Sequence, residues 1–156
     1  MKYTRLTKEQ FEELHKEFIN FLATQSITAE EWQKIKTNQP EVAEQELDIF
    51  SDLVWEGVLQ KATYLENLAP QQLFLFKIED TSMQLILIKV LDESKDITTA
   101  KDYQWLQENY MNDSVEFFEA TKEFSADKNA DIFSLIQQGA IITKGELFQF
   151  FEKLVG

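Results

Sequence analysis

The stretch from Pro40 to about Gln60 constrains the fold most, because it predicts one long helix with two unlike faces. At about 100° per residue, its apolar side chains collect along one side, as in a helix packed on a core. The predicted core stripe consists of Ala43, Leu47, Phe50, Val54 and Val58. Ile49 and Leu53 lie at its margins.

Four carboxylates, those of Glu44, Asp48, Asp52 and Glu56, follow one another on the other side at a spacing of four residues. Each neighbouring pair costs about 0.2–0.5 kcal/mol through repulsion. A basic partner or a divalent cation would relieve that repulsion, and so would screening by solvent. Trp55 lies within the same face, and aromatic residues are enriched at interfaces. We name these five residues the acidic face. A solvated outer surface is the favoured interpretation, and a partner-docking surface is the alternative.

The length and composition predict a single globular domain over residues 1–156. There is no cysteine, so disulfides and thiolate chemistry are excluded, and a reducing compartment is compatible with the sequence. Residues 1–22 carry charges throughout and do not resemble a signal peptide. No apolar run approaches the ~20 residues that cross a bilayer. We therefore expect a cytoplasmic protein with no membrane partner.

The charge balance of 15 basic against 28 acidic residues gives a net charge of −13. Binding to nucleic acid is disfavoured, because it depends on Lys and Arg neutralising phosphates. Anionic membrane surfaces are disfavoured for the same reason. A basic protein is the partner that this balance favours.

The local patterns predict an α+β fold. Capping boxes at Thr7–Gln10 and Thr28–Glu31, followed by Pro40, predict three helices in the first third of the chain. Leu73–Ile78 and Leu85–Val90 predict two strands joined by a tight turn. Residues 114–124 fit either a strand or a helix, and a strand is favoured because a two-stranded sheet alone is marginal.

The last third of the chain predicts two helices. Residues 131–138 predict a short helix with Asp131 as its N-cap. The final helix is predicted to face inward through Leu147, Phe150, Phe151 and Leu154, with Phe148 outside that stripe. The predicted architecture is an N-terminal layer of three helices packed on a small antiparallel sheet, with C-terminal helices. Apolar residues on both faces of the strands, and Phe148, make a homo-oligomer an expectation as well.

Glu12 and His15 are a further constellation that suggests chemistry. Their spacing is half of the Glu-x-x-His motif of di-iron bundles, which need two such motifs and two further glutamates. The chain has only one histidine, so a complete motif is excluded. Packing at the edge of the first helix is the alternative. We assign no catalytic residue, no metal ligand and no cofactor.

Three segments resemble a small bacterial family of uncharacterised function: Leu6–His15, Glu46–Glu56 and Gln137–Glu146. The resemblance implies no activity, substrate or site residue.

The leading hypothesis for function is a non-catalytic protein-interaction or regulatory module that offers its acidic face to a basic partner. A metal-dependent enzyme built from carboxylates and His15 is the alternative. An acidic nucleic-acid mimic ranks third, because a mimic would carry acidic rows on several elements and only one predicted helix has such a row.

Overall fold

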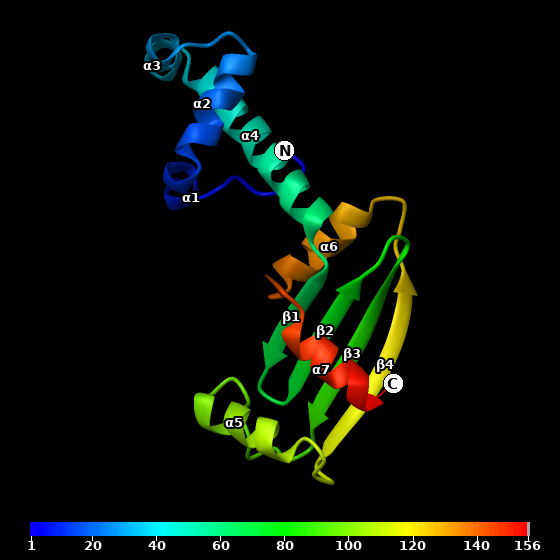
Figure 1. Ribbon diagram of the computed structural model, residues 1–156. Helices are drawn as coiled ribbons and strands as arrows, with labels where there is room; N and C mark the ends of the chain where they lie inside the picture. Colours follow the sequence, from blue (N-terminus) through cyan, green and yellow to red (C-terminus); the bar gives the residue numbers. More distant parts are fainter. Residues whose placement is uncertain (156) are drawn as a thin grey trace. The chain divides into compact units, whose positions relative to one another are not determined.

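The computed structural model describes residues 1–155 and confirms an α+β protein, with seven helices and a five-stranded antiparallel sheet in that range. It divides into two compact units, Met1–Gln60 and Lys61–Gly156, which we describe separately as the helical unit and the sheet unit. Figure 1 shows the elements of each unit. A single domain over the whole chain stays a prediction. No helix within residues 1–155 is both long and apolar enough to cross a membrane.

The helical unit consists of four helices: α1 (Lys8–Glu13), α2 (His15–Thr24), α3 (Ala29–Asn38) and α4 (Pro40–Lys61, whose last residue belongs to the sheet unit). The predicted starts are confirmed. The Thr7 side chain accepts a hydrogen bond from the backbone N–H of Gln10, whose own side chain accepts from the backbone of Thr7. The Thr28 side chain accepts a hydrogen bond from the backbone N–H of Glu31, so Thr28 is the N-cap of α3. Local capping chemistry therefore sets where these helices begin.

The first predicted helix is broken in two at Leu14, so the prediction of three helices was one short. Leu14 leaves helical geometry, with φ −100° and ψ 23°. The rings of Phe11 and Phe18, on either side of the break, both contact Phe50 of α4, at centroid distances of 6.1 and 5.1 Å. The break has no Gly or Pro to announce it, and tertiary packing of these rings accompanies it.

The long helix α4 confirms most of its predicted core stripe. Ala43 and Phe50 are buried, and Leu47 and Val54 pack at the margin of a buried cluster that contains Phe50. Val58 is exposed, so its place in the stripe was wrong, and the marginal Ile49 and Leu53 are exposed as well. The apolar arc read from the sequence is wider than the part of α4 that is buried.

The sheet unit contains the strands β1 (Tyr64–Ala69), β2 (Gln72–Ile78), β3 (Ser82–Val90), β4 (Val115–Glu123) and β5 (Ile141–Thr143), with the helices α5 (Ala100–Asn109), α6 (Lys128–Gln137) and α7 (Glu146–Val155). The strand order is β4-β3-β2-β1-β5, and all pairs are antiparallel. The predicted strands and the turn between β2 and β3 are confirmed, and most of residues 114–124 form the strand β4, Val115–Glu123. Neither β1 nor β5 was predicted as a strand from the sequence.

One face of the sheet carries the core of this unit. The register pairs Leu75 with Ile86 and Leu73 with Ile88, so these side chains share a face. Helix α7 packs on β2 and β3 (Figure 1) and buries Phe148 and Phe151 in the same cluster.

The predicted inner stripe of α7 was therefore wrong at three positions: Phe148 is buried, whereas Phe150 and Leu154 are exposed. Phe148 is 1% exposed and Phe150 is 46% exposed, the reverse of the expectation. Apolar residues occur on more than one side of this helix, so periodicity does not decide which side faces the sheet. A second correction concerns α6, where Asp127 rather than Asp131 is the N-cap and accepts from the backbone N–H of Ala130. Asp131 instead accepts hydrogen bonds from Ser125.

Candidate functional site

The acidic face lies on α4 as predicted, and its side chains bind the segment Lys2–Leu6 of the same chain. The Asp52 carboxylate accepts hydrogen bonds from the backbone N–H groups of Lys2 at 2.7 Å and of Tyr3 at 2.9 Å. A carboxylate that accepts from two successive amides acts much as a helix cap does, because it satisfies backbone donors that have no strand or helix partner.

Glu56 holds the side chains of the same two residues. Its Oε1 accepts from the Tyr3 hydroxyl at 2.6 Å and lies 3.1 Å from the Lys2 ammonium. Burial raises the pKa of Tyr3, and the hydrogen bond to Glu56 raises it further. The phenol is therefore held in its neutral, donating form.

Arg5 covers the first half of the acidic face. Its Nε donates to Asp48 at 2.7 Å, and its guanidinium reaches within 4.0 Å of Glu44. The hydrogen bond to Asp48 raises the pKa of Arg5. Glu44 keeps 67% of its side chain exposed, whereas the other three carboxylates of the acidic face belong to half-buried residues.

Backbone groups of the segment complete the attachment. Trp55 donates through its indole N–H to the Thr4 carbonyl at 3.0 Å, and the Leu6 N–H donates to the buried hydroxyl of Ser51 at 3.0 Å. The same hydroxyl donates to the Leu47 carbonyl at 2.7 Å. The acidic face thus has an intramolecular partner, an option that neither sequence-based interpretation considered. Lys2 and Arg5 were the available signal, because their charges complement the row.

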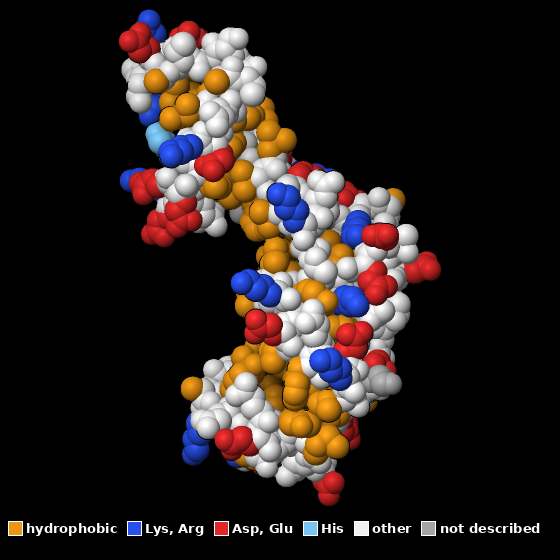
Figure 2. Space-filling view, viewed as in Figure 1, with side chains coloured by type: hydrophobic (Ala, Val, Ile, Leu, Met, Phe, Trp, Pro, Cys, Tyr) orange, Lys and Arg blue, Asp and Glu red, His pale blue; other side chains and the backbone are white. Residues whose placement is uncertain are grey.

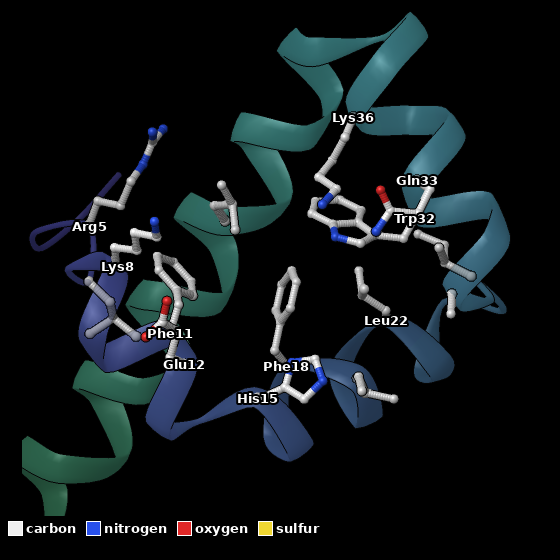
Figure 3. A pocket seen from close by; sticks show the side chains of 15 residues that line it. Arg5, Lys8, Phe11, Glu12, His15, Phe18, Leu22, Trp32, Gln33 and Lys36 are labelled. Atoms are coloured by element: carbon white, nitrogen blue, oxygen red, sulfur yellow. The ribbon is translucent and has the colours of Figure 1, made fainter.

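A second feature of the helical unit is an apolar groove of about 640 Å³, which was not predicted from the sequence. Figure 3 shows it from close by. Its lining comes from all four helices, the segment before α1 and the loop between α2 and α3: Arg5, Leu6, Lys8, Phe11, Glu12, His15, Phe18, Ile19, Leu22, Ile27, Ala29, Trp32, Gln33, Lys36 and Leu47. Its size falls in the range of about 300–1,000 Å³ that is typical of ligand pockets.

Aromatic rings form the floor of the groove. Phe18 lies at its centre, with an edge-to-face contact to Trp32 at 5.2 Å and another to Phe11 at 6.0 Å. Such pairs add about 0.5–1.5 kcal/mol each beyond simple burial. Because Phe18 also packs on Phe50, the floor is fixed to α4 and has a defined shape.

Charged side chains stand at the rim of the groove. Lys8 extends from α1 and Lys36 from α3, on opposite sides of the rings (Figure 3). The Lys36 ammonium lies 6.0 Å from the centroid of the Trp32 ring, a cation–π contact. Within residues 1–155, neither lysine lies within ion-pair distance of a carboxylate. Figure 2 shows hydrophobic side chains gathered on the visible face of this unit, with Lys or Arg beside them.

Glu12 and His15 both line this groove, so the two residues singled out as a half-motif are brought to one place. Both are exposed at its rim. Across the described part of the chain, no three His, Asp or Glu side chains form a group that could hold a metal ion. The acidic face and the groove share Arg5, which binds Asp48 and also lines the groove.

The fold and these two surfaces define an α+β protein whose helical unit combines an internally satisfied acidic face with an open apolar groove. The chain belongs to a family of unknown function, DUF6495, whose model matches residues 1–156. Comparison with curated proteins gives no match, and comparison with solved structures gives none either.

Proposed function

We propose that this protein is a non-catalytic, cytoplasmic protein-interaction module that binds its partner in the groove of the helical unit. The observation that carries the proposal is the groove itself, an apolar depression of about 640 Å³ with three aromatic rings and two lysines that form no ion pair within the described residues. A cytoplasmic location is supported by the absence of cysteine. The resemblance to a bacterial family points to a bacterial cytoplasm.

The arrangement of the rings favours a protein partner. Phe11 and Trp32 are only partly buried, so each retains surface that a ligand can cover. Aromatic side chains that are held in place beforehand contribute strongly to protein interfaces, because little conformational entropy is lost on binding. A groove between helices is also the receptor for partners that dock an amphipathic helix.

The acidic face supplies a second surface for the same kind of function. Glu44 is the carboxylate with the most exposed area, and a basic partner would reach it beside Arg5. Contact with Asp52 or Glu56 requires that the partner compete with Lys2 and Tyr3. A partner that docks at Asp52 and Glu56 must therefore replace the ammonium, phenol and amide groups of Lys2 and Tyr3 with donors of its own.

A photo-crosslinking amino acid at Gln33, which lines the groove, tests the proposal in lysate of the source organism. The expected result is a protein crosslinked at Gln33 and not at the neighbouring Lys34, which does not line the groove. Ile19→Glu places a charge at an exposed lining position and should abolish the crosslink. Ile49→Glu changes an equally exposed isoleucine of α4 outside the groove and should leave it intact. Crosslinks of equal yield from Gln33 and Lys34, or an unchanged yield in Ile19→Glu, would contradict the proposal.

A further inference from the structure

The charge of the groove is opposite to the charge of the chain. Acidic residues outnumber basic ones by 28 to 15 overall, whereas the groove lining contains Arg5, Lys8 and Lys36 against a single carboxylate, Glu12. Asp48 already compensates Arg5. Lys8 and Lys36 are left as the cations available to a ligand.

Each of these lysines stands beside an aromatic ring of the floor. Lys8 is one turn before Phe11 on α1, and the Lys36 ammonium lies 6.0 Å from the Trp32 ring on α3. In Figure 3 the two amines reach inward from opposite sides, with Phe18 between them. A ligand seated on the rings would therefore meet a positive charge on both of its flanks.

The positions of Lys8 and Lys36 on opposite sides of the groove distinguish between two kinds of amphipathic anion. A fatty acid has one carboxylate at the end of its apolar chain, so it would use one lysine and leave the other without a partner. A helix that presents apolar residues to the groove carries other side chains along both edges of its apolar stripe. Carboxylates on those edges would meet Lys8 and Lys36 together, and charge complementarity of this kind sets both the partner and its orientation.

We infer that the groove binds an acidic amphipathic helix of another protein, with apolar anchors on the aromatic floor and an Asp or Glu on either side of them. The inference rests on the proposed function and adds the chemistry of the partner. Anchors occupy the space between Phe11 and Trp32, one carboxylate pairs with Lys8, and one pairs with Lys36.

A phage-displayed library of random peptides, selected against the full chain, tests the inference without knowledge of the natural partner. The enriched peptides should carry aromatic or aliphatic residues at helical spacing, flanked by Asp or Glu. Their synthetic versions should bind about tenfold or more weakly to Lys8→Glu and to Lys36→Glu, because each change replaces an attraction by a repulsion. Lys16→Glu and Lys34→Glu alter exposed lysines of α2 and α3 outside the groove and should change binding less than about twofold.

Four results would overturn the inference. The first is that the enriched peptides are neutral or basic and that their binding is still abolished by Ile19→Glu. The groove would then remain a protein-binding site, but its partner would not be acidic. Dodecanoate that binds the groove and displaces the peptides, with equal loss of its own affinity in both lysine variants, would identify a small amphipathic anion as the occupant. Light scattering that shows a dimer, which Lys8→Glu converts to a monomer, would identify a second copy of the chain. Failure to enrich any peptide, together with no crosslink at Gln33, would refute the proposed function as well.

Discussion

The Tyr3 hydroxyl donates a hydrogen bond of 2.6 Å to the Glu56 carboxylate, a residue 53 positions later in the chain. Tyr3 is also buried, and its burial and this hydrogen bond both raise the pKa of its phenol. The pair connects the start of the helical unit to the far part of α4.

This pKa shift predicts a loss of stability in alkali. An unfolded tyrosine ionises near pH ~10, whereas Tyr3 in the folded protein keeps its proton to higher pH. The stabilisation is fully present below pH ~10 and is lost as the pH rises from there through the folded pKa, because the unfolded chain then binds fewer protons than the folded one. Urea unfolding between about pH 8 and 11 should show this fall in the wild type and a shallower fall in Tyr3→Phe. Tyr103→Phe removes the other tyrosine with a raised pKa and should retain the Tyr3 component. Identical slopes for Tyr3→Phe and the wild type would contradict the assignment.

Ser51→Ala should destabilise the protein by about 1–3 kcal/mol, because the buried N–H of Leu6 would lose its acceptor. The same change frees the Leu47 carbonyl, which retains its place in the helix. Urea denaturation monitored by tryptophan fluorescence measures the difference. Ser134→Ala, at an exposed position of α6, should change stability by less than about 0.5 kcal/mol. Equal effects of the two substitutions would refute a structural role for the Ser51 hydroxyl.

Reversing the charge of the acidic face should release the segment Lys2–Leu6. In a variant with Asp48→Lys, Asp52→Lys and Glu56→Lys, the amides of Lys2 and Tyr3 lose their acceptor and should exchange with solvent faster. Hydrogen–deuterium exchange measures this. The control reverses three exposed glutamates of the same unit, Glu13, Glu17 and Glu41, and should leave the exchange unchanged.

The same pair of variants tests docking at the acidic face. A basic partner that docks there should be lost with the first variant and retained with the control. An unchanged set of captured partners with both variants would show that docking at the acidic face is wrong.

Two glycines should respond to alanine with opposite signs. Gly145 has φ +81°, and a Cβ there would lie 2.3 Å from the Tyr64 ring. Gly145→Ala should therefore cost at least about 1–2 kcal/mol from the backbone alone, with the displacement of the ring in addition. Gly57 lies inside α4 with open space around its Cα, so Gly57→Ala should stabilise by about 0.5–1 kcal/mol. Thermal and urea unfolding give both signs, and a neutral Gly145→Ala would contradict the Tyr64 contact.

A matched pair of phenylalanines tests which side of α7 faces the sheet. Phe148→Ala should cost about 3–5 kcal/mol, as expected for a cavity in a packed core. Phe150→Ala removes a ring that is 46% exposed and should cost clearly less. Urea unfolding of both variants measures the contrast. The reverse order would restore the stripe that the sequence predicted.

Local chemistry explains which parts of the fold were predictable. The capping box at Thr7, the N-cap at Thr28 and the apolar strands β2 and β3 are signals contained within a few residues, and each is confirmed. The strand β1 alternates only weakly, and β5 consists of three residues that become a strand through pairing with β1. Tertiary contacts rather than propensity define those two strands.

The two surfaces were hidden for a different reason. Periodicity showed the carboxylates of α4 correctly but could not show that Lys2 and Arg5 meet them. The groove requires Lys8 and Lys36 to face each other across rings from separate helices, an arrangement that depends on how the helices cross. Sequence patterns report which face of one helix is apolar, and they do not report which faces of several helices enclose a space.

The attachment of Lys2–Leu6 to α4 also has a consequence for the order of events during synthesis. The hydrogen bonds from Lys2 and Tyr3 reach residues about 50 positions later. Forming them closes a long loop and costs chain entropy, whereas the hydrogen bonds within α1, α2 and α3 join residues close in sequence and cost less. Those short helices can nucleate as they leave the ribosome, whereas the first residues have no acceptor until Asp52 and Glu56 emerge. Nascent chains arrested before Asp52 should therefore be cleaved by protease within residues 2–6, and chains arrested well beyond Glu56 should be protected. The acidic face can therefore hold Lys2–Leu6 only after nearly the whole helical unit has been synthesised.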